Sequence, residues 1–73
     1  MDTLLTEFGL HLAQIRQQHN LSQEQLAEKS GLHRTYISSL ERGKRNPTIV
    51  TLNALSEALN ISLSDLVNWK RLN

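Results

Sequence analysis

The chain has 73 residues, and a chain of this length forms one small domain that buries only about 60% of its unfolded surface. It contains no cysteine, which excludes disulfide bonds and thiolate metal sites and fits a reducing compartment. Its acidic N-terminus excludes a secretory signal, and no apolar run reaches the ~18 residues of a membrane span. We therefore expect a cytoplasmic protein, here a single domain over residues 1–73.

The net charge of +1 conceals an uneven distribution of charge along the chain. Residues 31–47 carry a net charge of +3, and the rest of the chain carries −2. A local basic patch is typical of nucleic-acid-binding surfaces, although a short basic run also occurs on solvated helix faces. The charge pattern alone leaves both interpretations open. The four cations of this segment are Arg34, Arg42, Lys44 and Arg45.

The first predicted helix covers residues 4–20, where five apolar residues recur at helical spacing. Gly9 lies inside this helix and costs roughly 1 kcal/mol relative to alanine. Asn20 is a suitable residue to end the helix. The apolar residues are Leu4, Leu5, Phe8, Leu12 and Ile15.

The second predicted helix covers residues 23–30 and has the best-marked start in the chain. Ser22 is followed three residues later by Gln25, which is the pattern of a capping box. Leu21 and Leu26 occupy the two hydrophobic positions that accompany such a cap. Gly31 ends the helix because glycine adopts positive φ angles without strain.

Three more helices complete the predicted all-α fold. The third begins near His33 or Arg34 and ends at Gly43, and the fifth covers residues 63–69 after Ser62. Between them Thr48 caps a fourth helix over residues 49–60. The residues expected to face the core are Ile37 and Leu40 in the third helix, and Ile49, Leu52, Leu55 and Leu59 in the fourth.

The second and third helices are short and are joined by a turn that contains Gly31. Two short helices joined by such a turn cross steeply, as in a helix-turn-helix. Ala27 is small where the two helices must approach closely, and Ile37 and Leu40 form the buried side of the third helix. This spacing predicts a helix-turn-helix over about residues 22–42.

Residues 12–67 resemble the Cro/phage-repressor (Xre-type) family of helix-turn-helix DNA-binding proteins. The resemblance rests on three stretches, IRQQHNLSQEQLAEKSGL, YISSLERGKRNPTIVTLNALSEALN and LSDLV. The stretch HRTYISSLERGKRNPTI is also similar to the small controller proteins of restriction–modification systems. The resemblance implies a compact five-helix, lambda-repressor-like domain from a bacterium or phage. It further implies a transcriptional regulator that binds a palindromic DNA operator as a homodimer.

In this family the third helix lies in the major groove with its N-terminal residues at the base edges. Arg34 would then bond to guanine through two hydrogen bonds, the alternative being a phosphate contact. Thr35 offers a methyl group to thymine or a hydroxyl group to a base or phosphate. The predicted base-reading residues are His33, Arg34, Thr35, Ser38 and Ser39.

Phosphate contacts are expected on both sides of the third helix. Gln23 opens the second helix, where free N–H groups favour an anion, and the family uses a glutamine there for this purpose. Tyr36 carries a phenol that suits a phosphate better than a base. The predicted phosphate-binding residues are Ser22, Gln23, Tyr36, Arg42, Lys44, Arg45 and Asn46.

Two further sets of residues are expected to support DNA binding. In the family an arginine and a glutamate at the places of Arg16 and Glu41 pair across two helices, which implies a structural clamp here. A monomer reads only a few base pairs, so family members usually bind as twofold dimers. The candidate dimer residues, some of which could instead close the small core, are Ile49, Val50, Leu66, Val67 and Trp69.

The sequence also argues against other functions. His11 and His19 could share a helix face, but they lack further ligands at suitable spacing, so no metal site is predicted. No nucleophile and base have the spacing of a catalytic set, so we expect no enzyme activity, no cofactor and no small-molecule ligand. Two alternatives stay open: an antitoxin-type protein-interaction module, and the DNA-binding fragment of a longer repressor. The capped ends and the start methionine are compatible with a natural short protein, and an N-terminal fragment stays open as well.

Overall fold

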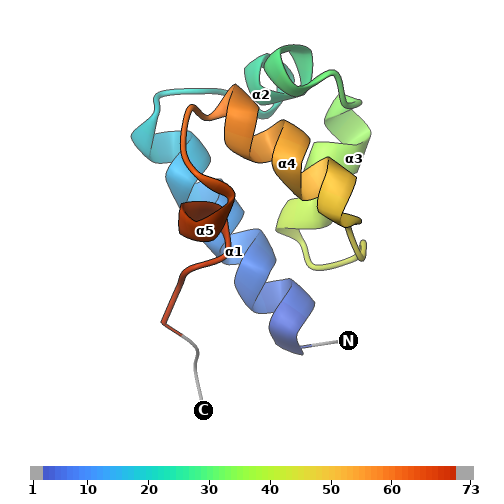
Figure 1. The fold of residues 1–73 in the computed structure, drawn as a ribbon. Helices are drawn as coiled ribbons and strands as arrows, with labels where there is room; N and C mark the ends of the chain where they lie inside the picture. The colour runs from blue at the N-terminus through green and yellow to red at the C-terminus, as the bar shows by residue number, and fades with distance from the viewer. Residues whose placement is uncertain (1–2, 71–73) are drawn as a thin grey trace.

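The computed structural model describes residues 3–70, which form five α-helices and no β-strand (Figure 1). The all-α prediction is therefore confirmed. None of these helices combines the length and the apolar character that crossing a membrane requires. The helices are α1 (Thr3–Gln18), α2 (Gln23–Ser30), α3 (Arg34–Glu41), α4 (Ile49–Ala58) and α5 (Leu63–Leu66).

Hydroxyl side chains cap three of the five helices. The Ser22 hydroxyl accepts from the backbone N–H of Gln25 at 3.0 Å, and the Gln25 side chain accepts from the backbone N–H of Ser22 at 2.8 Å, so the predicted capping box is present. The hydroxyl groups of Thr48 and Ser62 cap α4 and α5, each by accepting from the backbone N–H three residues later. At α3 the N-cap is His33, whose ring makes no capping hydrogen bond.

The helix ends differ from the prediction at four places, one of which is α3, which ends at Glu41 and not at Gly43. α1 and α4 stop two residues earlier than expected, at Gln18 and Ala58. The asparagine at the end of each predicted range takes a left-handed backbone conformation, with φ of 58° at Asn20 and 55° at Asn60. α5 ends at Leu66 because the chain then leaves the helix and brings Trp69 against α1, so the tertiary contact outweighs the helical pattern.

The core forms where the five helices meet. α1 packs against α3, α2 packs against both α3 and α4, and α4 packs against α5 (Figure 1). One inward assignment was wrong: Ile49 is 64% exposed, because it lies in the first turn of α4, beyond the edge of the core. Leu4, in the first turn of α1, is likewise 42% exposed. The fully buried side chains are Leu12, Leu26, Ile37, Leu40, Leu55, Leu59 and Leu66.

α1 touches the end of α3 backbone to backbone, and two glycines make this contact possible. A Cβ atom added at Gly9 would lie 2.5 Å from the carbonyl oxygens of both Leu40 and Glu41. A Cβ atom added at Gly43 would lie 2.7 Å from the Cα atom of Thr6. Gly9 therefore permits a close approach of the two helices, which places the end of α3 against α1.

Candidate nucleic-acid interface

The turn between α2 and α3 is formed by Gly31 in the left-handed conformation, with φ of 75°. The backbone N–H groups of Gly31 and Leu32 both donate to the carbonyl oxygen of Ala27, the second at 3.1 Å. Ala27 is buried, so its small side chain lies at the close approach of the two helices. This is the helix-turn-helix arrangement that the sequence predicts.

α3 presents two different faces. Ile37 and Leu40 are buried on its inner face. On the outer side the first-turn residues are exposed and the two serines one turn later are partly exposed. Among residues 3–70 none of these outer side chains makes a hydrogen bond, so their polar atoms are available to a partner. The outer face, which holds all five predicted base-reading residues, consists of His33, Arg34, Thr35, Ser38 and Ser39.

Exposed cations follow the carboxyl end of α3. Gly43 is buried against Thr6 with φ of 73°, so the segment leaves α3 at a fixed place. The guanidinium carbon of Arg45 lies 5.8 Å from the ring centroid of Tyr36, within cation–π range. This contact holds Arg45 beside α3. The exposed polar side chains of the segment are Arg42, Lys44, Arg45 and Asn46.

The two predicted phosphate ligands at the start of α2 have different surroundings. The capping box uses the backbone N–H of Ser22, which leaves its hydroxyl hydrogen as a donor. Gln23 is partly buried, and its side-chain nitrogen donates to Glu41 Oε1 at 3.0 Å. This bond could not be predicted, because the two residues are 18 positions apart and neither pattern nor spacing links them.

Arg16 and Glu41 form the ion pair that the family resemblance implies. Arg16 Nε lies 2.7 Å from Glu41 Oε2, and Arg16 Nη2 lies 3.0 Å from Oε1. Arg16 Nη1 also donates to the carbonyl oxygen of Leu21 at 2.8 Å. The side chains are only 12% and 7% exposed, and the hydrogen bond to Glu41 raises the pKa of Arg16 despite this burial. Whether this pair affects DNA binding stays a prediction.

The candidate dimer residues divide between the surface and the core. Ile49, Val50 and Val67 are 64%, 74% and 45% exposed, so their apolar side chains are accessible to a second copy. Leu66 is fully buried and cannot contact a second copy, so its assignment to the dimer surface was wrong. Its position at the end of α5 points it into the core. Trp69 is partly buried and packs on Phe8, with ring centroids 5.9 Å apart.

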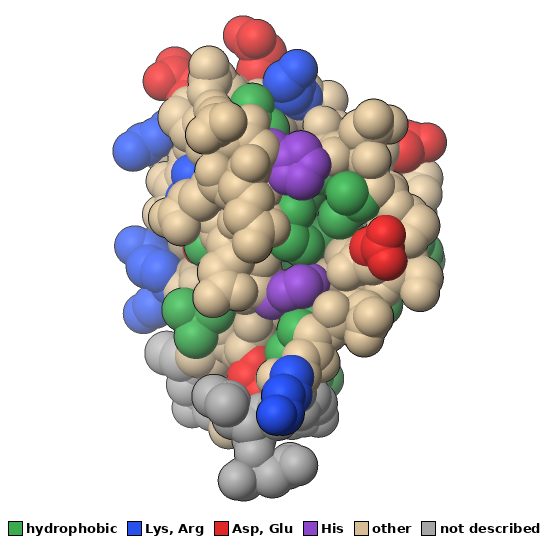
Figure 2. All heavy atoms as spheres, turned by 90° about the vertical axis from the view of Figure 1, so that its left-hand side faces the viewer, with side chains coloured by type: hydrophobic (Ala, Val, Ile, Leu, Met, Phe, Trp, Pro, Cys, Tyr) green, Lys and Arg blue, Asp and Glu red, His purple; other side chains and the backbone are tan. Residues whose placement is uncertain are grey.

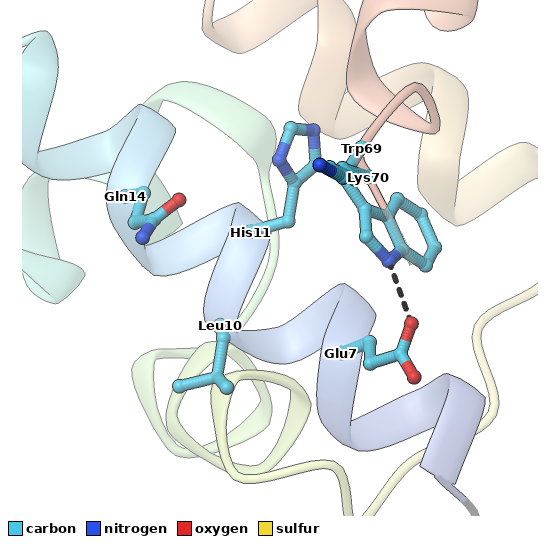
Figure 3. A pocket seen from close by; sticks show the side chains of 6 residues that line it. All are labelled: Glu7, Leu10, His11, Gln14, Trp69 and Lys70. Atoms are coloured by element: carbon cyan, nitrogen blue, oxygen red, sulfur yellow. Dashed lines mark hydrogen bonds between the residues drawn. The ribbon is translucent and has the colours of Figure 1, made fainter. Parts of the chain in front are cut away.

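A hollow of about 290 Å³ lies between α1 and the segment after α5 (Figure 3). Trp69 Nε1 donates to Glu7 Oε1 at 3.1 Å, and the His11 ring lies 5.4 Å from the indole. His11 Nε2 is 3.3 Å from the carbonyl oxygen of Asp65. The hollow contains none of the predicted DNA contacts, and its interactions hold the C-terminal segment on α1.

The histidines do not form a metal site in the described part of the chain. In Figure 2 the two visible histidine side chains are separated by apolar side chains. His19 Nδ1 lies 2.8 Å from the carbonyl oxygen of Ile15, whereas His11 packs on Trp69. Within residues 3–70 no three side chains of metal-binding type come together.

Several characterised proteins resemble this chain in sequence. Residues 12–66 match the family model for helix-turn-helix proteins. The control protein C.SmaI of Serratia marcescens is 62% identical over 54 residues, which cover 74% of this chain and 64% of that protein. The control protein C.BamHI of Bacillus amyloliquefaciens is 44% identical over 63 residues, covering 85% of this chain and 78% of that protein.

The fold also resembles solved structures of restriction–modification controller proteins. C.AhdI from Aeromonas hydrophila superposes with a TM-score of 0.83 and is 44% identical, covering 85% of this chain and 94% of that one. A chain of C.Esp1396I, from the structure of its tetramer in complex with its natural 35-base-pair operator, superposes with a TM-score of 0.80 and is 40% identical. The match covers 85% of this chain and 82% of that one. With the match over residues 12–66, these similarities show that the chain belongs to the helix-turn-helix family.

Proposed function

We propose that this chain is a sequence-specific DNA-binding transcriptional regulator that places α3 in the major groove. The observation that carries the proposal is the outer face of α3, whose polar side chains make no hydrogen bond within residues 3–70. Arg34 and Thr35 lie in the first turn of α3, the part of a recognition helix that meets base edges. Arg34 is the proposed guanine reader, and Thr35, Ser38, Ser39 and His33 complete the reading surface.

Phosphate contacts would frame this surface at both ends. Gln23 and Ser22 lie at the start of α2, and Arg45 stands beside α3 on the ring of Tyr36. Each phosphate that a cation neutralises should contribute about −0.9 to the slope of log affinity against log salt. The other proposed phosphate ligands are Arg42, Lys44 and Asn46.

We further propose that the protein acts as a homodimer on a palindromic operator, as the controller of a restriction–modification system. The similarity to several controller proteins, one of them solved as a tetramer on its operator, supports this assignment. We infer that regulation works by occupancy of the operator, with no catalytic step. A regulator of this kind acts where the genome lies, which for a bacterial protein is the cytoplasm.

Selection of duplexes from a random pool tests the proposed function. We expect a palindromic consensus whose half-sites are about ten base pairs apart. On the selected duplex, Arg34→Ala should weaken binding by about 1–3 kcal/mol and relax the base preference at one position of each half-site. Lys44→Ala is the comparison, because loss of a phosphate contact weakens binding to all sequences alike. A uniform loss with Arg34→Ala would reassign Arg34 to a phosphate, and failure to enrich any sequence would reject specific binding.

The dimer proposal predicts that Val50→Glu produces a monomer. Val50 is 74% exposed, so the substitution should leave the folded monomer intact while it places a charge in an apolar interface. Sedimentation at micromolar concentration should show a dimer for the unchanged protein and a monomer for the variant, with weaker operator binding. Gln18→Glu adds the same charge to an exposed site on α1 and should stay dimeric. A wild-type protein that sediments as a monomer and binds one copy per operator would refute the proposal.

A further inference from the structure

The carboxylate of Glu41 joins three helices through hydrogen bonds. It accepts two bonds from Arg16 of α1, at 2.7 and 3.0 Å. It accepts a third, at 3.0 Å, from the side-chain nitrogen of Gln23 of α2. Because the Glu41 side chain is only 7% exposed, little water can replace a lost donor. Each of the three bonds therefore matters for the position of the carboxylate.

The Gln23–Glu41 bond closes a loop formed by α2 and α3. Gln23 is the first residue of α2 and Glu41 is the last residue of α3. The other ends of the two helices are already joined by the turn at Gly31. Each helix has eight residues, about 12 Å of length, so two attachments at opposite ends define the angle between their axes. Without the second attachment, only the turn and the apolar packing of the two helices would set this angle.

We propose that Gln23 is a positioning residue for α3, which its bond to Glu41 holds at the angle to α2 that base reading requires. The inference rests on the proposed DNA-binding function and adds a role to the phosphate contact proposed for this residue. The amide nitrogen of glutamine carries two hydrogens. One is donated to Glu41, and the second is left for a phosphate oxygen. A single nitrogen thus joins contact with the DNA backbone to the orientation of the reading helix.

A positioning role and a phosphate contact predict different binding data. Base contacts such as the one proposed for Arg34 are directional, so a change in the angle of α3 weakens them selectively. A lost phosphate contact weakens binding to every sequence to the same extent. The ratio of affinities for the selected operator and for a random duplex of equal length therefore separates the two roles.

Gln23→Met is the test variant, because methionine has a similar length and no donor. We expect the ratio of operator to random-duplex affinity to fall about tenfold, since a hydrogen bond to a charged group is lost. Gln23→Asn shortens the amide by one methylene group and should lower the ratio similarly. Lys44→Met should lower both affinities by the same factor, and Gln18→Met, on the exposed side of α1, should change neither.

The ¹⁵N spectrum of the free protein provides a second readout that needs no DNA. The Arg16 Nε–H resonance reports the bond to Glu41, and we expect it to shift in Gln23→Met but not in Lys44→Met or Gln18→Met. Equal losses of both affinities together with an unchanged Arg16 resonance would overturn the proposal. If the unchanged protein showed no sequence preference, the proposed function would fail, whereas the Arg16 resonance would still test the link between Gln23 and the ion pair.

Discussion

Glu41→Ala is expected to lower the free energy of unfolding by about 3 kcal/mol, because it leaves the partly buried guanidinium of Arg16 without its partner. It also removes the acceptor of Gln23, so the carboxyl end of α3 loses its side-chain hydrogen bonds to both α1 and α2. Operator affinity should therefore fall as well, even at temperatures where the variant is fully folded. Urea unfolding followed by circular dichroism measures the first effect, and operator titration measures the second.

Glu57→Ala is the matched control for this substitution. Glu57 is an exposed glutamate on α4, and among residues 3–70 its side chain makes no ion pair. It should change the unfolding free energy by no more than about 0.5 kcal/mol. In the double variant Arg16→Ala/Glu41→Ala the loss should be smaller than the sum of the single losses, because the two residues act as a pair. Unchanged stability and unchanged DNA affinity in Glu41→Ala would contradict the clamp.

Gly9→Ala is expected to lower the free energy of unfolding by about 2 kcal/mol or more, although alanine is favoured over glycine by about 1 kcal/mol inside a helix. The added Cβ would lie 2.5 Å from two backbone carbonyl oxygens, so α1 and α3 must move apart. Urea unfolding measures this loss. An increase in stability would show that helix propensity dominates and that the backbones are not in contact.

Gly31→Ala provides a contrasting glycine with a different physical origin for its cost. Apart from Gly31 and its two chain neighbours, no residue has an atom within 4 Å of the Cβ position at Gly31, so the substitution causes no clash. Its φ of 75° is the left-handed region, where an alanine costs about 1–2 kcal/mol. Asparagine tolerates this region better, so Gly31→Asn should recover part of the loss, whereas Gly9→Asn should be at least as damaging as Gly9→Ala.

The local signals in the sequence were sufficient to predict most of the fold. Ser22 with Gln25, Thr48 and Ser62 mark helix starts, because a hydroxyl next to a helical pattern satisfies free N–H groups directly. Gly31 marked the turn for a similarly local reason. The prediction failed for Ile49 and for the end of α5, where helical periodicity gives no information about the edge of the core. Both outcomes depend on residues distant in the sequence.

The candidate site was predictable only in part, for the same reason. The outer face of α3 follows from the inward positions of Ile37 and Leu40, and the structure places the five base-reading candidates there. The Arg16–Glu41 pair came from family resemblance, since its members are 25 positions apart. The Gln23–Glu41 bond could not be inferred from spacing at all. From the sequence, Gly9 predicts only a loss of helix stability, because its role depends on the backbone contact with α3.

The missing cap of α3 has a consequence for how such a protein can evolve. His33 is exposed and makes no capping hydrogen bond, and the neighbouring Arg34 and Thr35 are exposed without side-chain hydrogen bonds within residues 3–70. Mutations at these three positions therefore change the free energy of unfolding little, because the stability of α3 depends on its buried residues. A duplicated gene could acquire a new DNA preference through successive changes there, each intermediate remaining folded and open to selection.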